Sequence, residues 1–490
     1  MTHEPTRAAE DAAHPSSRAS TGSWSELFSG EHATASLVLA GGVAVFAMNT
    51  FITSALLPTT VEEIGGEQYY SWVTTTFMVA SVLTAMLVAR ALASWGAARA
   101  YLVAFLLFAV GSVGAALTPT MELLLVARVL QGLGGGLLAG LGYAVIRDAL
   151  PERLWTRATG LVSAMWGFGT LVGPATGGLF AQLELWRGAF WLLAVIAVVL
   201  GVMALRALPR RSRVAEDFGA VPVAPLLVLV LAAAAFSAAT IVGAGWPTAS
   251  ALLAGGALLI GFVLADRTAS SPVFPRITYQ RGNPLKWIYI VLGVLTSAAM
   301  VEIFLPKFGQ ELAGMSPLVA GLFGATVSVG WSFVQLGSAS VDSERASRRL
   351  MVVGPVLMVA GLVVFAATQH STADWIAWAW VAALVLAGAG VGLAFPHFSV
   401  AAMRSSDDPV EASKAAAGVG TAELVANAIS SALIGALVVA GGPGAAGSMA
   451  MGVGVAALGV VGVVAALRAL RHLRGAHGSH GSDETTTVLA

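Results

Sequence analysis

The chain has 490 residues, of which 57% are hydrophobic and 11% are charged, and its formal net charge is zero. An average soluble domain carries about 25% charged residues, so this composition excludes an ordinary soluble protein. Zero net charge gives no sign of a nucleic-acid partner. Because cysteine is absent, disulfides, thiolate metal sites and cysteine nucleophiles are excluded as well.

The two ends of the chain are polar. Residues 1–34 are rich in Ser, Thr, Pro and charged side chains, and no apolar core opens the chain. We therefore predict a disordered cytoplasmic tail rather than a cleaved signal peptide. Residues 469–490 are similar and hold several His residues, which we interpret as a second solvated tail and not as a metal site.

Between the tails, 14 apolar stretches alternate with short polar breaks. Each stretch approaches or exceeds the length of about 20 residues that a helix needs to cross a bilayer. The pattern predicts an all-α polytopic membrane protein with 14 transmembrane helices. The predicted spans are 35–58, 70–92, 98–117, 121–147, 157–181, 187–207, 222–243, 246–266, 286–306, 317–338, 349–369, 374–403, 413–440 and 445–468.

Positive charges gather on alternate breaks. All of the 26 Lys and Arg residues except Arg128, Arg187 and Lys307 fall on the breaks and tails that share a side with the N-terminus. By the positive-inside rule, both termini should lie in the cytoplasm and the protein in the cytoplasmic (inner) membrane.

The spans divide into halves. Polar linkers at 208–221 and 267–285 bracket the seventh and eighth spans. We therefore predict a six-helix bundle over 35–207, linkers with two extra helices over 208–285, and a second six-helix bundle over 286–468. Two such bundles around a central cavity, with substrate bound near the midplane, is a common transporter plan. No soluble stretch is long enough for a catalytic domain, so we expect no enzyme and no cofactor.

The fourth span contains a charge among glycines. Gly132, Gly136 and Gly140 recur every four residues and offer a smooth face for close helix packing. Arg128 lies about two turns into this span, followed by Gln131. An Arg inside a membrane costs at least a few kcal/mol, so it is a functional candidate that should face a cavity or a partner.

The fifth span contains the run Gly-Phe-Gly-Thr-Leu-Val-Gly-Pro-Ala-Thr-Gly-Gly over residues 167–178. Pro174 removes a backbone donor and bends the helix, while the glycines permit tight packing at the bend. We predict a pivot or close-contact element there, built from Gly169, Gly173, Pro174, Gly177 and Gly178.

These motifs resemble those of the major facilitator superfamily. The segment from Arg128 to Gly132 is similar to the family's fourth-helix motif, whose Arg is implicated in proton coupling. The run that ends at Gly178 is similar to the fifth-helix motif associated with antiporters that export drugs. The extra helix pair resembles the 14-helix drug:proton antiporter branch. The resemblance implies two bundles that rock by alternating access.

Two features depart from that family. The loop between the second and third spans, aligned on Gly96, has Ala at most of the positions where the family carries its Asp and cations. The acidic residue expected in the first span is also missing, and Asn49 occupies its place. Asn can hydrogen-bond a substrate, but it cannot carry a proton.

Three other titratable residues are candidates for proton coupling. Glu423 lies about 14 Å of helical rise beyond Lys414, near the bilayer centre. The alternative is a structural Glu that bonds to a neighbouring helix or aligns with Asn427 on the same face. Glu302 lies near the outer end of the ninth span, where a hydrated or Lys307-paired acid is at least as good an interpretation as a proton site. His397 follows a proline in the twelfth span, where a packed His is the more common case.

Aromatic and amide side chains complete the candidate cavity. Trp166 and Trp331 are deep enough to line it, with Gln335 beside Trp331, and they would suit an apolar or cationic ligand. We predict proton-coupled export of small hydrophobic or amphiphilic compounds by a monomer in the lipid bilayer. The alternatives are an uncoupled facilitator or importer of a specific metabolite, a lipid transporter, and a non-transporting receptor.

Overall fold

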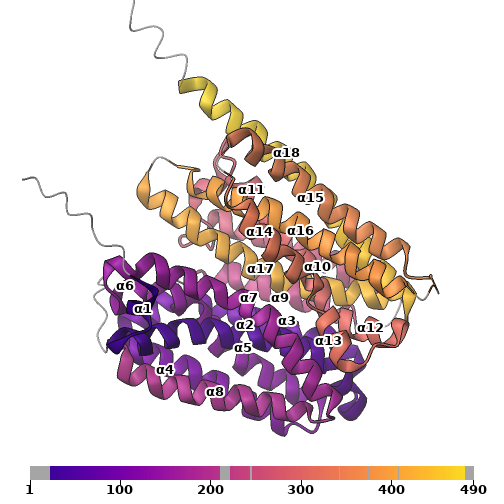
Figure 1. Ribbon diagram of the computed structural model, residues 1–490. Helices are drawn as coiled ribbons and strands as arrows, with labels where there is room; N and C mark the ends of the chain where they lie inside the picture. Colours follow the sequence, from indigo (N-terminus) through magenta and orange to yellow (C-terminus); the bar gives the residue numbers. More distant parts are fainter. Residues whose placement is uncertain are drawn as a thin grey trace, which may run out of the picture.

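A computed structural model describes the fold of residues 23–209, 221–242, 245–341, 343–371, 373, 375–406 and 408–480. Across these residues the regular structure is entirely helical. The apolar sequence accounts for this, because in a bilayer each backbone donor and acceptor must be satisfied within its own segment, and a helix does so. Figure 1 shows the helices as two groups lying side by side.

The first group is the N-terminal bundle, which fills the indigo to magenta part of Figure 1. Its long helices are α2 (Gly30–Ile64), α3 (Tyr70–Ala85), α4 (Val88–Leu117), α5 (Met121–Ala144), α7 (Trp155–Gln182) and α8 (Trp186–Ala207). Short elements connect them: α1 (Trp24–Leu27), η1 (Glu67–Tyr69), α6 (Ile146–Ala149) and η2 (Glu152–Leu154).

The C-terminal bundle follows two intervening helices. The intervening pair is α9 (Val223–Ala238) and α10 (Trp246–Thr268), joined to the bundle through η3 (Arg276–Tyr279). The bundle consists of α11 (Leu285–Ala299), η4 (Met300–Ile303), α12 (Leu305–Ala313), α13 (Pro317–Phe323), α14 (Thr326–Ser338), α15 (Glu344–Ala367), α16 (Ile376–Met403), α17 (Pro409–Gly441) and α18 (Ala445–His480).

The prediction of 14 spans is confirmed, since every predicted stretch holds a helix or a helix pair. Among the described residues, ten helices are long and apolar enough to cross a membrane, and α13 with α14 forms one further span bent by 41°. The other three are α3 and α9, each of 16 residues, and the glycine-rich α7, of 28 residues. The protein is therefore a multi-pass membrane protein.

The helices extend beyond the predicted span limits. Helix α1 and the start of α2 lie within the segment predicted as a tail, and α18 continues past residue 468 to His480. A buried Leu27 and an ion pair of 2.5 Å between Glu26 and Arg153 hold α1 in place. The Arg153 contact lowers the pKa of Glu26, so the carboxylate stays ionised below the usual Glu range. The ion pair is lost only when the pH falls through that lowered pKa. Residues 1–22 and 481–490 lie outside the described residues.

The two ends of the bundles differ, and we name them by their contents. The tail end holds α1, α6, η3 and the last turns of α18, and the far end holds η1, η4 and α12. Figure 1 shows α1 and α6 on the opposite side from α12. The chain turns at the tail end through Gly96, whose φ of 72° is a left-handed conformation that favours glycine.

Helix α5 packs closely on its neighbours, as the four-residue glycine spacing predicts. A Cβ on Gly132 or Gly136 would overlap a backbone carbonyl of α3, and a Cβ on Gly140 would overlap the Val88 side chain at the start of α4. These close approaches place α5, and with it Arg128, against α3 at the centre of the N-terminal bundle.

Helix α9 touches both bundles at the far end. Trp72 of α3 donates its indole N–H to the Ser237 carbonyl at 2.9 Å, and Thr240 donates to the Gln68 carbonyl at 2.9 Å. On the other side, α9 contacts α17 near Gly435. The extra pair therefore lies over the line where the two bundles meet.

A buried carboxylate fixes the link from α10 to the C-terminal bundle. Asp266, fully buried, accepts hydrogen bonds from the backbone N–H groups of Val273 and Phe274 at 2.5 and 3.1 Å. The Tyr279 hydroxyl also donates to Asp266 at 2.6 Å. Burial, together with this hydrogen bond, raises the pKa of Tyr279 above its usual value. The linker is a capped turn, which sets where α10 lies against α11.

Candidate functional site

Arg128 is fully buried and is held by neutral acceptors. Its Nε donates to the Val73 carbonyl at 3.0 Å, and its Nη1 donates to the side-chain oxygens of Asn49 at 3.0 Å and Gln131 at 2.7 Å. The guanidinium carbon also lies 4.4 Å from the centre of the Phe77 ring, a cation–π arrangement. Helices α2, α3 and α5 thus meet at one charged side chain.

This cluster carries a positive charge with no acidic partner among the described residues. Gln131 passes the network on to Ser112 at 2.9 Å, while Nη2 of Arg128 and Nδ2 of Asn49 are buried without a hydrogen-bond partner. Asn49 therefore does occupy the position facing Arg128. As an amide, it accepts one hydrogen bond there but neutralises no charge.

Replacing Arg128 with Lys should destabilise the protein. A Lys ammonium cannot reach three acceptors in the fork geometry of a guanidinium, and buried acceptors left unpaired cost about 1–3 kcal/mol each. We expect a lower unfolding temperature in detergent, measured by the loss of monodisperse protein on heating. Lys at the exposed Arg206 of α8 is the control and should melt as the wild type does.

The fifth-helix motif divides its contacts between the two bundles. A Cβ on Gly169, Gly173 or Gly177 would lie 2.5 to 2.7 Å from atoms of α2, so this face fixes α7 to its own bundle. Gly178 instead meets the C-terminal bundle, where its Cβ would lie 2.9 Å from Leu318 Cα. The carbonyl of Pro174 lies against Gly321 in the same way.

The face of α7 that contacts the C-terminal bundle at Gly178 is open at two glycines nearer the tail end. Gly167 and Gly160 precede Gly178 by about three and five helical turns, so all three share one face. No atom outside α7 lies within 4 Å of the Cβ position of Gly167 or Gly160. The bundles therefore touch at the far end and separate toward the tail end along α7.

A second contact line between the bundles, α3 against α17, behaves in the same way. At the far end, the hydroxyls of Thr75 and Ser431 are 2.9 Å apart, and Ser71 contacts Gly435. Gly420 lies about three turns before Ser431 on the same face of α17, and its Cβ position has no neighbour within 4 Å. The gap is thus open at the tail end on both sides of the molecule.

Polar contacts seal the far end. Ser54 of α2 donates to the Glu302 carbonyl at 2.7 Å, and Tyr70 of α3 donates to the Ile303 carbonyl at 3.4 Å. Lys307 forms an ion pair with Glu67 of η1 across the bundles and a second, at 3.7 Å, with Glu311 in its own helix. These contacts tie α2, α3 and η1 to η4 and α12.

Glu302 lies inside this seal. The residue is 4% exposed, and its carboxylate accepts from the Ser328 backbone N–H at 2.7 Å and from the Ser328 hydroxyl at 2.6 Å. The structure shows no hydrated acid at this position and no ion pair with Lys307, which uses Glu67 and Glu311 instead. Glu302 therefore links η4 to α14 within the C-terminal bundle.

Glu423 lies in the open half. It is half-buried on α17, and no hydrogen bond or ion pair to it occurs among the described residues. Tyr143 of α5 is close enough for electrostatic interaction, and it forms a hydrogen bond of 3.1 Å with Ser163 of α7. Asn427, one turn further along, is 8% exposed, and its Oδ1 is buried without a partner. Glu423 and Tyr143 thus come from opposite bundles.

The predicted aromatic residues occupy both bundles. Trp166 is 37% exposed and stacks edge-on against Phe46 at 5.6 Å. Trp331 donates its indole N–H to Gln335 and lies 5.2 Å from the Phe395 ring. Trp331 and Gln335 are therefore satisfied by each other, whereas Trp166 presents an aromatic surface beside the open segment of α7.

His397 has a structural hydrogen bond. Its Nε2 lies 3.1 Å from the Ser338 hydroxyl, which itself donates to the Leu393 carbonyl at 2.8 Å. Because that hydroxyl has one proton and uses it for Leu393, it accepts from His397. The ring joins α16 to α14 and lies apart from Arg128 and Glu302.

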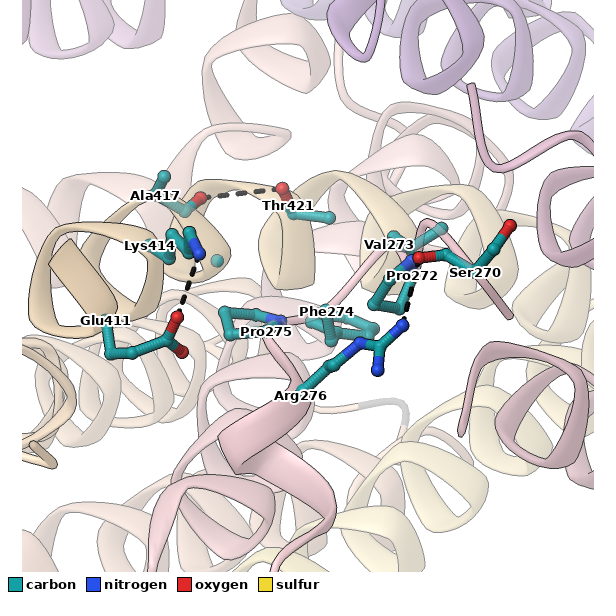
Figure 2. A pocket seen from close by; sticks show the side chains of 11 residues that line it. Ser270, Pro272, Val273, Phe274, Pro275, Arg276, Glu411, Lys414, Ala417 and Thr421 are labelled. Atoms are coloured by element: carbon teal, nitrogen blue, oxygen red, sulfur yellow. Dashed lines mark hydrogen bonds and ion pairs between the residues drawn. The ribbon is translucent and has the colours of Figure 1, made fainter. Parts of the chain in front are cut away.

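A cavity of about 430 Å³ lies at the tail end, between the linker that precedes α11 and the start of α17. In Figure 2, Lys414 donates to Glu411 at 2.8 Å and Arg276 donates to the Ser270 carbonyl at 3.1 Å. Its lining comes from the linker and α17 alone. This hollow therefore belongs to the surface of the C-terminal half and not to the gap between the bundles.

Sequence reasoning missed the residues of the seal. Ser54, Tyr70, Thr75 and Ser328 are single hydroxyls within apolar helices, and nothing local distinguishes them from packing residues. The one available signal is the acidic Glu302 followed by Lys307, which indicates a polar end but not its partners. Within the predicted linker 208–221, residues 210–220 lie outside the described residues, as does residue 374 at the start of the twelfth predicted span.

The bent helices, the two six-helix bundles and the gap between them define a transporter fold. Residues 39–430 match the Major Facilitator Superfamily. The chain belongs to this family.

Two groups of relatives are informative. A "Probable multidrug-efflux transporter" of Mycobacterium tuberculosis is 42% identical over 85% of this chain and 90% of its own. "Multidrug resistance protein 3" of Bacillus subtilis is 22% identical over 74% and 71%. Among solved structures, a POT family transporter superimposes with a TM-score of 0.65 at 14% identity over 89% of this chain and 95% of its own. A D-xylose-proton symporter gives 0.62 at 16% identity, over 89% and 96%. At these identities the structures show the fold alone.

Proposed function

We propose that this protein is a proton-coupled exporter of small hydrophobic or amphiphilic compounds that works by alternating access. The observation that carries the proposal is the face of α7 that packs on the opposite bundle at Gly178 and has no neighbour at Gly167 and Gly160. A gap sealed at one end and open at the other is one of the two states that alternating access requires. Both extremes of the cycle are then related by rocking one bundle against the other.

The open end is assigned to the cytoplasm. The tail end carries the basic breaks, and by the positive-inside rule this side faces the cytoplasm, with both termini. In this state the cavity would take up compounds from the cytoplasm or the inner leaflet. Its aromatic surface at Trp166 suits flat apolar or cationic molecules.

Two carboxylates have different roles in this scheme. Glu423, half-buried in the open half without a hydrogen-bond partner among the described residues, exchanges protons with the cytoplasm in this state. Glu302, enclosed by Ser328, is positioned to respond when the far end opens. Arg128 supplies a fixed positive charge, which disfavours bound cations until a carboxylate is ionised.

The relatives support export. Proteins named for multidrug efflux or multidrug resistance match most of this chain, at 42% identity in the M. tuberculosis case. We infer the same broad substrate class for this protein, and action as a monomer.

The direct test is transport in proteoliposomes with an imposed pH gradient. With the lumen acidic, protons leaving should drive a lipophilic cationic dye such as ethidium inward at least tenfold faster than without a gradient. An ionophore that abolishes the gradient should remove this difference. If dye flux is saturable but ignores the gradient, the protein is an uncoupled facilitator and the antiport proposal is wrong.

That facilitator is the second candidate. The observation in its favour is that Arg128 faces Asn49, an amide with no titratable proton. The centre of the N-terminal bundle thus offers Arg128 no carboxylate among the described residues, which is what an uncoupled facilitator would have.

A further inference from the structure

A groove lies on the lipid-facing side of the protein, between α10 and the C-terminal bundle. It has a volume of about 350 Å³, and its walls come from α10, η3, α11, α17 and α18. Leu259, Phe262 and Val263 form one wall, and Ala426, Ile429 and Leu433 form the opposite one. The walls are almost wholly apolar, so the groove suits a hydrocarbon chain.

The groove opens sideways to the bilayer. Only 17% of the apolar segment of α10 is buried, and the groove residues Val263 and Ile290 are 48% and 40% exposed. The helix thus stands off from the bundle with its outer surface against lipid. A molecule in the groove would be continuous with the surrounding membrane.

The length of the groove matches one leaflet. Its lining on α11 runs from Lys286 to Ser297, a rise of about 16 Å for eleven residues. Half of a bilayer core is about 15 Å. The groove therefore extends from the headgroup level at the tail end to about the midplane.

Positive charge lies at the headgroup end. Lys286 lines the groove, and Arg468 of α18 stacks on the neighbouring Trp287 ring at 4.6 Å. Neither cation has an acidic partner among the described residues. The indole N–H of Trp287 is also buried without a hydrogen-bond partner. Two cations and a spare donor beside an apolar groove form a complement to a phosphate joined to an acyl chain.

We propose that this groove binds an anionic phospholipid of the tail-side leaflet. One acyl chain lies between α10 and α11, and the phosphate is held by Lys286 and Arg468. Because α10 is otherwise joined to the bundle mainly through its capped linker and α17, the lipid fills the space between the extra helix pair and α11. This site is separate from the gap between the bundles, so it does not depend on the transported compound.

Native mass spectrometry of the full-length protein tests the headgroup. Increasing phosphatidylglycerol or phosphatidylcholine is added to the delipidated protein, and the first bound lipid is counted. We expect phosphatidylglycerol to bind more tightly to the wild type. The double variant Lys286→Gln with Arg468→Gln should lose about tenfold or more of that affinity. Arg206→Gln, an exposed cation at the tail end of the N-terminal bundle, is the control and should bind as the wild type does.

A second variant tests the groove itself. Gly293 lines it, and the nearest atom to its Cβ position is Ala426 Cβ at 3.4 Å, so Gly293→Leu fits the helix but fills the groove. It should displace the first phosphatidylglycerol, while Gly256→Leu on the open side of α10 should not. An unchanged dye-binding constant shows that each variant is folded. Equal affinity for both lipids, no effect of the cation pair, or no effect of the filled groove would each overturn the proposal.

Discussion

Replacing Glu423 with Gln is expected to abolish the response of transport to a pH gradient. The amide keeps the size and polarity of the side chain but cannot gain or lose a proton, and no other described residue bonds to Glu423. We expect gradient-driven dye uptake to fall at least tenfold. Dye exchange without a gradient should continue, because it needs rocking but no net proton movement.

The control for this result is Glu302→Gln. Each of its two carboxylate oxygens accepts one hydrogen bond from Ser328. Gln has an oxygen in only one of these positions, so one of the two hydrogen bonds is lost. We therefore expect Glu302→Gln to slow exchange with and without a gradient. Should it abolish coupling while exchange persists, and Glu423→Gln leave coupling intact, the two roles proposed here are reversed.

Enlarging Gly178 to Leu is expected to shift the protein toward the state that is open at the far end. The added Cβ would lie 2.9 Å from Leu318 Cα and 3.0 Å from the Pro317 carbonyl, and backbone atoms cannot move aside. Overpacking of this kind costs about 1–3 kcal/mol, which corresponds to a shift of about five- to 150-fold between the states. We expect this free-energy cost to destabilise the state that is sealed at the far end, and to leave the stability of the fold unchanged.

Single cysteines can report the shift, because the natural chain has none. A cysteine in place of Ser54 at the seal should react faster with a thiol reagent in the Gly178→Leu variant, and a cysteine in place of the exposed Ser163 more slowly. The matched control is Gly167→Leu, whose Cβ position has no neighbour in this state. If Gly178→Leu leaves both rates unchanged, the contact at Gly178 does not hold the far end shut.

The span count and the close packing of α5 could be predicted because each follows from a local pattern. Apolar length decides a span, and glycine spacing decides which face of a helix comes close to another. That Arg128 has a hydrogen-bond partner could also be predicted, because a charge in a membrane must find acceptors and Gln131 lies one turn away, but its contacts with α2 and α3 could not.

The partners across the bundles could not be predicted in this way. Ser54 and Glu302 are 248 residues apart, and the hydroxyl of Ser54 is chemically no different from that of a serine that bonds within its own helix. Glu302 and Lys307 are close in sequence, which suggests an ion pair between them. In the fold, Lys307 pairs instead with Glu67 of the other bundle. Which face of a helix meets the opposite bundle depends on the tilt of both.

Because Gly178, Gly167 and Gly160 share one face of α7, a small tilt about the contact at Gly178 moves the tail end of the helix by a large distance. From Gly178 to Gly160 the helix rises about 27 Å, so each degree of tilt about Gly178 moves Gly160 by about 0.5 Å. A tilt of about 10° would carry the tail-end tip of α7 by about 5 Å. A small displacement at Gly178 thus produces a large displacement at the tail end of α7. We therefore expect a methyl group added at Gly178 to move that end further than a methyl group added elsewhere on this face.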